Sequence, residues 1–96
     1  MRFIALFLDD VQPAQIDADL TRDHFDYLAA RRDRITEAGG LREGPEAPFC
    51  GSLWVIEADT LAEAQALAEG DPYCKAGLRP ECRVLQWNRA PLPKTD

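Results

Sequence analysis

The sequence predicts an α+β domain of ferredoxin-like order, β-α-β-β-α-β, in which a four-stranded antiparallel sheet carries two helices on one face. Three observations support this prediction: two strand–helix–strand passes follow one another, glycines close both helices, and the strands are apolar on both sides. Because 96 residues make one domain, we expect a single domain over 1–96, with a folded core over about 1–89 and a C-terminal tail over 90–96.

The first strand and the first helix occupy the N-terminal part of the chain. Apolar and β-forming residues predict a strand over 2–8. A helix is expected over about 21–38, with Asp19 or Thr21 as its N-cap and Gly39-Gly40 as its end, since glycine reaches the left-handed conformation easily. Spacings of three and four define its predicted apolar stripe, which consists of Phe25, Leu28, Ala29, Arg32 and Ile35.

The next segment predicts two strands and a second helix. Leu41 to Glu43 is consistent with a short strand, and aromatic and β-branched residues over 52–57 predict a clearer one. Thr60-Leu61-Ala62-Glu63 has the pattern of a capping box, in which the threonine and glutamate each satisfy an unpaired amide. We expect the helix to run to about Glu69, to end at Gly70 and to turn four residues inward: Leu61, Ala64, Leu67 and Ala68.

The last segment predicts a turn and a final strand. Asp71-Pro72 restarts a turn or a short helix, with the aspartate as cap and the proline at the first helical position. Gly77 is expected to end this element. The final strand is expected over 82–88.

The strands do not alternate between apolar and polar residues, as they would in a sheet with one face in water. In the first strand Phe3, Ala5 and Phe7 point one way and Ile4, Leu6 and Leu8 the other. In the third strand Leu53 and Val55 oppose Trp54 and Ile56, and in the fourth Val84 opposes Leu85 and Trp87. Two helices cover only one face, and leaving five or six large side chains in water forgoes burial on the order of 10 kcal/mol. We therefore expect a homodimer, with two sheets packed face to face in an α+β barrel.

Composition excludes several classes of partner. The net charge is −6, with 17 acidic and 11 basic residues, and this field repels phosphate backbones and anionic membranes. The N-terminal apolar run is too short for a membrane span and lacks the layout of a secretory signal. Three cysteines without a C-x-x-C pair are consistent with reduced thiols in a cytoplasmic protein and with neither a disulfide nor structural zinc.

Few residues can carry chemistry, because phosphate-binding glycine motifs and long catalytic signatures are absent. His24 is the only histidine and lies at the margin of the predicted apolar stripe, so it can face a pocket or be a buried structural residue. Asp71 is either a helix cap or a functional carboxylate, and Tyr73 either packs its ring or lines a pocket. A nucleophilic Ser52 would need an adjacent base, which the sequence does not reveal.

A family resemblance combines several of these residues. The fragments that carry it are His24-Phe25-Asp26-Tyr27-Leu28, Gly44-Pro45, Gly51-Ser52, the run from Ala64 to Tyr73 with Asp71-Pro72-Tyr73 at its end, and Ala76-Gly77. In this order and spacing the chain resembles the YciI-like (YCII-related) family from its first strand to Trp87. The resemblance implies a fold similar to the dimeric α+β barrels and a pocket in which His24 approaches Asp71.

Related chemistry in that family includes dehydrochlorination of ring compounds, which is an elimination by proton transfer. The sequence departs from the family in two ways. Many relatives have an arginine three residues before the histidine, where Thr21 stands here beside Arg22, and the loop between the second and third strands is shorter. The resemblance therefore does not transfer an arginine that would bind an anionic substrate.

Our leading hypothesis is a small-molecule enzyme, a lyase or an isomerase, in which His24 is the general base or acid. Asp71 would orient His24 and favour its protonated form; Ser52, Tyr73 and Arg22 are candidates for substrate binding. No cofactor is expected. The alternative is a non-catalytic module that binds a small ligand or a protein partner. Haem or metal binding through His24 would lack partner ligands.

Overall fold

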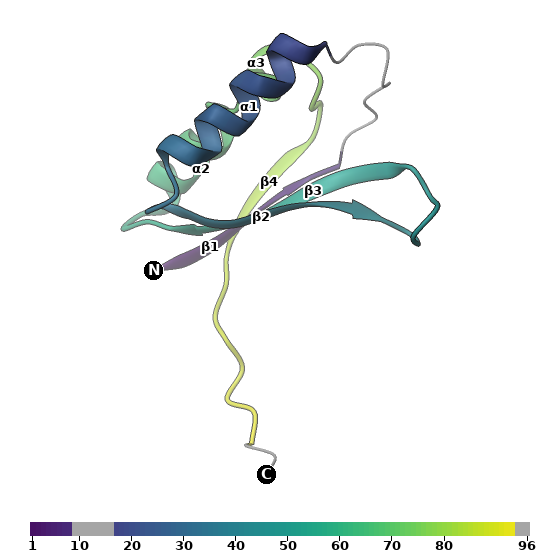
Figure 1. Cartoon of the computed structure of the whole chain (residues 1–96). Coiled ribbons are helices and arrows are strands. Elements are labelled where there is room, and N and C mark those ends of the chain that lie inside the picture. Colours follow the sequence, from purple (N-terminus) through teal and green to yellow (C-terminus); the bar gives the residue numbers. More distant parts are fainter. Residues whose placement is uncertain (9–16, 94–96) are drawn as a thin grey trace.

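The structure is a computed structural model that describes residues 1–8 and 17–93 (Figure 1). Its elements are, in order, β1 (Arg2–Phe7), α1 (Ala18–Ala30), β2 (Ile35–Arg42), β3 (Phe49–Glu57), α2 (Leu61–Glu69), α3 (Pro72–Lys75) and β4 (Cys82–Gln86). The strands form one antiparallel sheet of order β2-β3-β1-β4. The predicted β-α-β-β-α-β order is confirmed, with α3 as a short addition.

The core lies between the sheet and the helices, which all cover the same face (Figure 1). Phe3, Ala5 and Phe7 of β1 alternate with less buried neighbours and are at most 1% exposed. Strand pairing places Ala5 between Trp54 of β3 and Val84 of β4, so the inner face is continuous across the three strands. The rings of Phe7 and Trp54 lie 4.8 Å apart, and burying such aromatic pairs contributes strongly to the stability of the core.

The prediction of one long helix over 21–38 is wrong. Helix α1 already ends at Ala30, and Ile35 begins strand β2, whose pairing with β3 extends to Arg42. Gly39 and Gly40, expected to end the helix, lie inside this strand opposite Leu53 and Ser52. A helical spacing that reached Ile35 competed with strand pairing, and the pairing prevailed because it buries Ile35 against β3.

The N-terminus and the inward face of α1 also differ from the prediction. Asp17, rather than Asp19 or Thr21, is the N-cap, and its Oδ1 accepts a hydrogen bond from the Leu20 amide at 2.7 Å. The inward residues are His24, which is buried, and its half-buried neighbours Tyr27 and Leu28. Phe25, expected on the inward stripe, is 61% exposed. The true stripe therefore starts one residue earlier and carries His24 into the core.

Helix α2 begins with a cap close to the predicted one. The Thr60 hydroxyl accepts a hydrogen bond from the Glu63 amide at 3.1 Å, and the Glu63 carboxylate accepts one from the Asp59 amide at 3.2 Å. Ala64 and Ala68 are buried and Leu67 is half-buried, as expected, whereas Leu61 is 48% exposed. The small inward residues allow α2 to lie close to the sheet.

Replacing Thr60 with alanine should lower the free energy of unfolding by about 1 kcal/mol, because the Glu63 amide loses its acceptor. Urea unfolding followed by circular dichroism measures this change. Thr60→Ser keeps the hydroxyl and should restore most of the loss. An alanine variant as stable as the unmodified protein would contradict this account of the cap.

Over residues 1–8 and 17–93, no helix covers the second face of the sheet (Figure 1). Strand register places Ile4 between Val55 and Leu85, and Leu6 beside Leu53, on this face. Leu85 and Trp87 are each 43% exposed, and the chain after β4 runs away from the sheet on the side opposite the helices (Figure 1). This part of the sequence prediction, an apolar sheet surface without a helix over it, agrees with the arrangement of the strands.

Candidate active site

Four elements bring polar side chains together beneath the helix layer. His24 comes from the second turn of α1, Asp71 immediately precedes α3, Ser52 lies on β3, and Arg79 lies between α3 and β4. Ser52 pairs with Phe7 across the sheet and so shares its inner face. The residues are far apart in sequence, and the fold places them around one point.

His24 and Asp71 form a buried pair. Nδ1 of His24 lies 2.5 Å from Oδ1 of Asp71, and the two residues are 7% and 0% exposed. Asp71 precedes Pro72 as expected, but its side chain makes no capping hydrogen bond to α3. The structural explanation of Asp71 as a side-chain cap is therefore wrong, and its carboxylate is directed to His24 instead.

Arg79 is the residue that sequence reasoning missed. Its guanidinium contacts Oδ2 of Asp71 through Nη1 at 3.2 Å and donates through Nη2 to the Ser52 hydroxyl at 2.9 Å. The group is stacked 4.3 Å above the Phe7 ring, and Arg79 as a whole is only 8% exposed. The sequence signal that could have pointed to Arg79 is its position, eight residues after Asp71 in a loop that returns to the sheet. It was insufficient because arginines in loops are usually exposed.

The surroundings of Asp71 fix the tautomer of His24. A carboxylate flanked by a guanidinium and an imidazole acts as an acceptor only, so Nδ1 of His24 must donate to it. In the neutral ring the other nitrogen, Nε2, is then the basic one. The arrangement therefore supplies one proton acceptor, Nε2 of His24, and the buried carboxylate of Asp71 holds the imidazole ring in its orientation.

The other two predicted binding residues lie in different environments. Tyr73 stacks on His24, with ring centroids 4.2 Å apart and planes at 12°, and its hydroxyl donates to that of Thr21 at 3.3 Å. Arg22 points to solvent and pairs with Asp19 at 2.7 Å. The structure thus groups His24, Asp71, Ser52 and Tyr73, and it leaves Arg22 outside the group.

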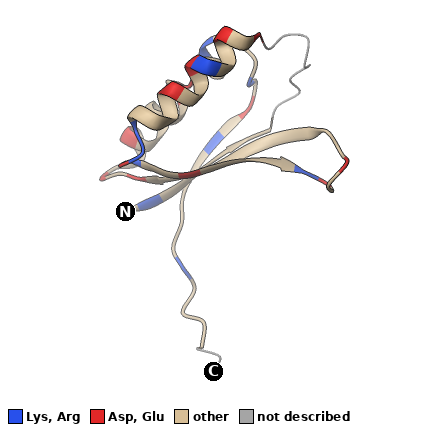
Figure 2. Cartoon of the chain, viewed as in Figure 1, with Lys and Arg blue, Asp and Glu red and all other residues tan. Residues whose placement is uncertain are grey.

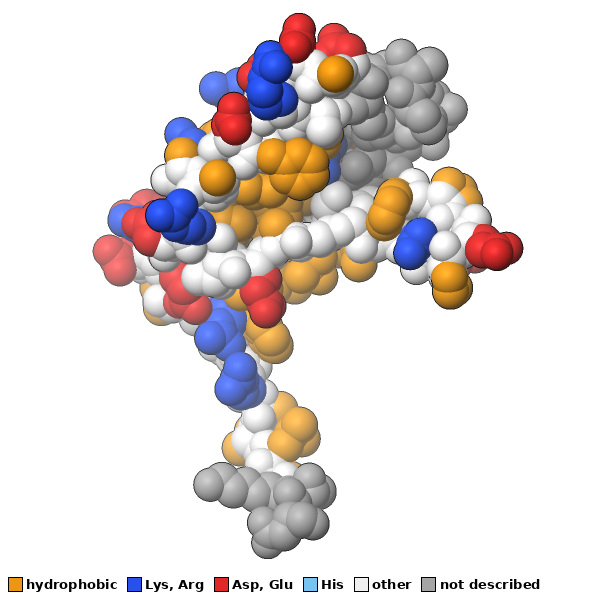
Figure 3. All heavy atoms as spheres, in the orientation of Figure 1, with side chains coloured by type: hydrophobic (Ala, Val, Ile, Leu, Met, Phe, Trp, Pro, Cys, Tyr) orange, Lys and Arg blue, Asp and Glu red, His pale blue; other side chains and the backbone are white. Residues whose placement is uncertain are grey.

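A cavity of about 120 Å³ lies beside His24, between α1 and the inner face of β2 and β3. Figure 3 shows hydrophobic side chains in the hollow between the helix layer and the sheet. Because Gly39 and Gly40 have no side chains, β2 contributes little more than backbone and the methyl group of Ala38 to the cavity wall. The lining residues are His24, Phe25, Leu28, Ala38, Gly39, Gly40, Ser52 and Trp54.

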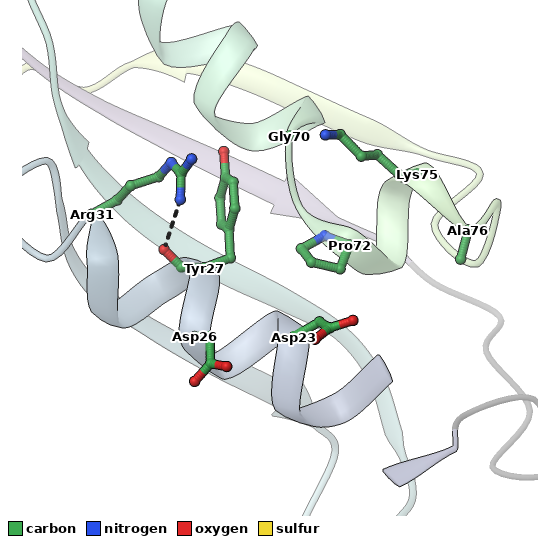
Figure 4. A pocket seen from close by; sticks show the side chains of 8 residues that line it. All are labelled: Asp23, Asp26, Tyr27, Arg31, Gly70, Pro72, Lys75 and Ala76. Atoms are coloured by element: carbon green, nitrogen blue, oxygen red, sulfur yellow. Dashed lines mark hydrogen bonds between the residues drawn. The ribbon is translucent and has the colours of Figure 1, made fainter. Parts of the chain in front are cut away.

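A larger hollow of about 620 Å³ lies on the solvent side of the helices, between α1 and α3 (Figure 4). Tyr27 stands between α1 and Gly70, and its hydroxyl donates to the Leu67 carbonyl at 2.6 Å. Burial raises the pKa of Tyr27, so this hydroxyl stays neutral. The lining includes the acidic Asp23 and Asp26 and the basic Arg31 and Lys75, and most of the charged side chains along α1 are acidic (Figure 2). This open, mixed-charge hollow offers no comparable reactive group.

No cysteine is among the residues that line the cavity beside His24. Burial raises the pKa of the Cys82 thiol, which disfavours a reactive thiolate. Over residues 1–8 and 17–93, no three side chains among His, Cys, Asp and Glu are grouped so that they could hold a metal ion. Over the same ranges no helix has the length and apolarity needed to cross a membrane.

Comparison with known proteins gives this site a context. The model of the YCII-related domain matches residues 1–88. The chain belongs to the YCII-related family. No curated protein matches it in sequence. Among solved structures, this YCII-related chain is similar to 5-chloro-2-hydroxyhydroquinone dehydrochlorinase (TftG) from Burkholderia phenoliruptrix AC1100, in complex with 2,5-dihydroxybenzoquinone. The TM-score is 0.78 at 26% identity, over 94% of this chain and 96% of that chain.

Proposed function

We propose that this YCII-related protein is a small-molecule enzyme in which His24 and Asp71 transfer a proton during an elimination. The observation that carries the proposal is the buried His24–Asp71 pair, 2.5 Å apart, at the wall of a cavity. A general base with a fixed orientation contributes typically 10²–10⁴-fold to a rate. The similarity to a dehydrochlorinase supports elimination over other proton transfers.

In such a step Nε2 of His24 removes a proton from a carbon atom of the substrate. The electron pair of that C–H bond forms a double bond, and a leaving group such as chloride departs from the neighbouring carbon with its own electron pair. Asp71 stabilises the imidazolium that forms, and His24 then releases the proton to water. All of these roles fall to groups that the structure holds within one buried cluster.

The size and lining of the cavity support a small, flat substrate. Its volume of about 120 Å³ is comparable with apolar cavities of about 150 Å³ that bind benzene. Phe25 and Trp54 supply ring surfaces, and Gly39 and Gly40 of β2 contribute backbone to the lining. A single-ring compound with polar substituents fits this description.

The test is chloride release from 5-chloro-2-hydroxyhydroquinone, the compound in the name of the similar enzyme. We expect turnover by the unmodified protein and a loss of at least about 10²-fold in His24→Gln. Asp26→Asn is the matched control, because Asp26 is exposed on the same helix. Unchanged turnover in His24→Gln would rule out the role of His24 as acid or base.

The second candidate is a module that binds a small ligand without transforming it. The observation in its favour is that the cavity is mostly apolar, with His24 and Ser52 as its polar side chains. A ligand that raises the melting temperature and is recovered unchanged after long incubation would favour this candidate. Product formation that depends on His24 favours the enzyme.

We also infer that the protein is a homodimer whose two sheets pack face to face. Leu85 and Trp87 are each 43% exposed on a sheet face that none of the described helices covers, and Ile4, Leu6 and Leu53 lie beside them in the strand register. A contiguous apolar surface of this kind is typical of an interface. The active-site cluster lies on the helical side of the sheet, so each protomer carries its own cavity.

A further inference from the structure

The polar side chains that line the cavity belong to a buried series of hydrogen bonds and ion pairs. His24 bonds to Asp71, Asp71 pairs with Arg79, and Arg79 bonds to Ser52. Both ends of this chain, His24 and Ser52, line the same cavity. The cavity is therefore lined by two polar groups, His24 and Ser52, that are linked through Asp71 and Arg79.

Arg79 cannot itself serve as a solvent-facing clamp for a substrate. Its side chain is only 4% exposed, and the guanidinium lies over the rings of Phe7 at 4.3 Å and Tyr73 at 5.1 Å. Such stacking favours a buried cation. Its positive charge therefore reaches the cavity through the residues to which it bonds.

The bond from Arg79 determines which role is open to Ser52. A serine hydroxyl has one hydrogen to donate and lone pairs to accept, and the guanidinium already donates to the oxygen. The oxygen that accepts from Arg79 still carries its own hydrogen, and Ser52 lines the cavity. Ser52 is therefore suited to donate a hydrogen bond into the cavity, and a neighbouring cation strengthens such a donor.

We propose that Ser52 binds an oxygen atom of the ligand by donating a hydrogen bond, and that Arg79 is the positioning residue that keeps Ser52 in this role. The assignment rests on the proposed function of the same cavity and names the chemistry of its ligand. The ligand carries a carbonyl or a ring-bound hydroxylate oxygen close to the carbon that His24 deprotonates. A donor aimed at this oxygen stabilises the negative charge that develops there as the proton leaves.

Two probes of equal ring size test the proposal by binding. 2,5-Dihydroxybenzoquinone carries ring oxygens, and benzene carries none. In Ser52→Ala we expect the affinity for the quinone to fall roughly tenfold or more, as for loss of a charge-assisted hydrogen bond, with benzene affinity unchanged. Ser52→Thr keeps the hydroxyl and should restore quinone binding. A merely structural defect would weaken both probes together.

Arg79→Lys tests the positioning role. Lysine keeps the charge but lacks the fork that reaches both Asp71 and Ser52, so it should weaken quinone binding selectively. Equal losses for both probes, no loss in Ser52→Ala, or no quinone binding to the unmodified protein would overturn the assignment. If Arg79→Lys does not fold, the variants Ser52→Ala and Ser52→Thr still test the assignment of Ser52. Binding is measured here without turnover. If the quinone-selective losses are found in a protein that releases no chloride, the proposed enzymatic function is contradicted while the assignment of Ser52 and Arg79 stands.

Discussion

Replacing Asp71 with alanine should lower the free energy of unfolding by about 3–5 kcal/mol, because a buried cation then loses its counter-ion. The Asp71 carboxylate is fully buried and contacts both Arg79, at 3.2 Å, and His24, at 2.5 Å. Arg79 as a whole is only 8% exposed, so water cannot replace the lost partner without opening the core. Urea unfolding followed by tryptophan fluorescence and circular dichroism measures the change.

The double variant Asp71→Ala/Arg79→Met separates the charge effect from lost packing. Removing both charges together should recover part of the stability that Asp71→Ala loses, since an apolar pair tolerates burial better than one unpaired ion. Asp26→Asn, at an exposed site, should change stability by no more than about 0.5 kcal/mol. An Asp71→Ala protein within about 1 kcal/mol of the unmodified protein would show that Arg79 finds another partner easily.

The strands were predictable because their residues combine β-propensity with placement between turns. The segments over 2–8 and 52–57 lie on the two central strands of the sheet, and residues 2–7 and 52–57 are all buried or half-buried. Buried strands are continuously apolar, so they can be recognised in the sequence without knowing which strands they pair with. The opposing faces of β1 followed directly from the alternation of its side chains.

The boundary between α1 and β2 was not predictable from local pattern. Residues 31–38 continue the helical spacing of Leu28, and Gly39-Gly40 has the composition of a helix end. The structure instead pairs Ile35 with Ile56 and Gly40 with Ser52. Pairing with a strand that lies later in the chain is a non-local interaction, so no window of neighbouring residues contains it.

The candidate site was partly predictable for the same reason. His24 stood out as the only histidine, and its approach to Asp71 came from the family resemblance rather than from spacing. Arg79 was missed because its importance depends on burial between Phe7 and Tyr73, which only the tertiary fold creates. Arg22 was named for its place beside Thr21, but a one-residue step on a helix turns a side chain by about 100°, and this step directs Arg22 to solvent.

Replacing Leu6 with glutamate should convert the inferred dimer into a monomer. Leu6 lies on the central strand β1, on the face without helices, between Arg83 and Leu53. In a twofold dimer the substitution introduces two carboxylates into one apolar interface, and each unpaired buried charge costs several kcal/mol. The dissociation constant should rise by at least about 10³-fold, which sedimentation equilibrium at micromolar concentration detects.

The matched control is Leu61→Glu, which makes the same substitution on α2, where Leu61 is 48% exposed on the helical side. This variant should stay dimeric, because the helical layer points away from the inferred partner. The two variants make the same substitution in the same protomer at two different surfaces. An equal effect of both on the dimer would therefore indicate general destabilisation. A monomeric unmodified protein, or a dimeric Leu6→Glu protein, would mean that something other than a second sheet shelters the apolar face.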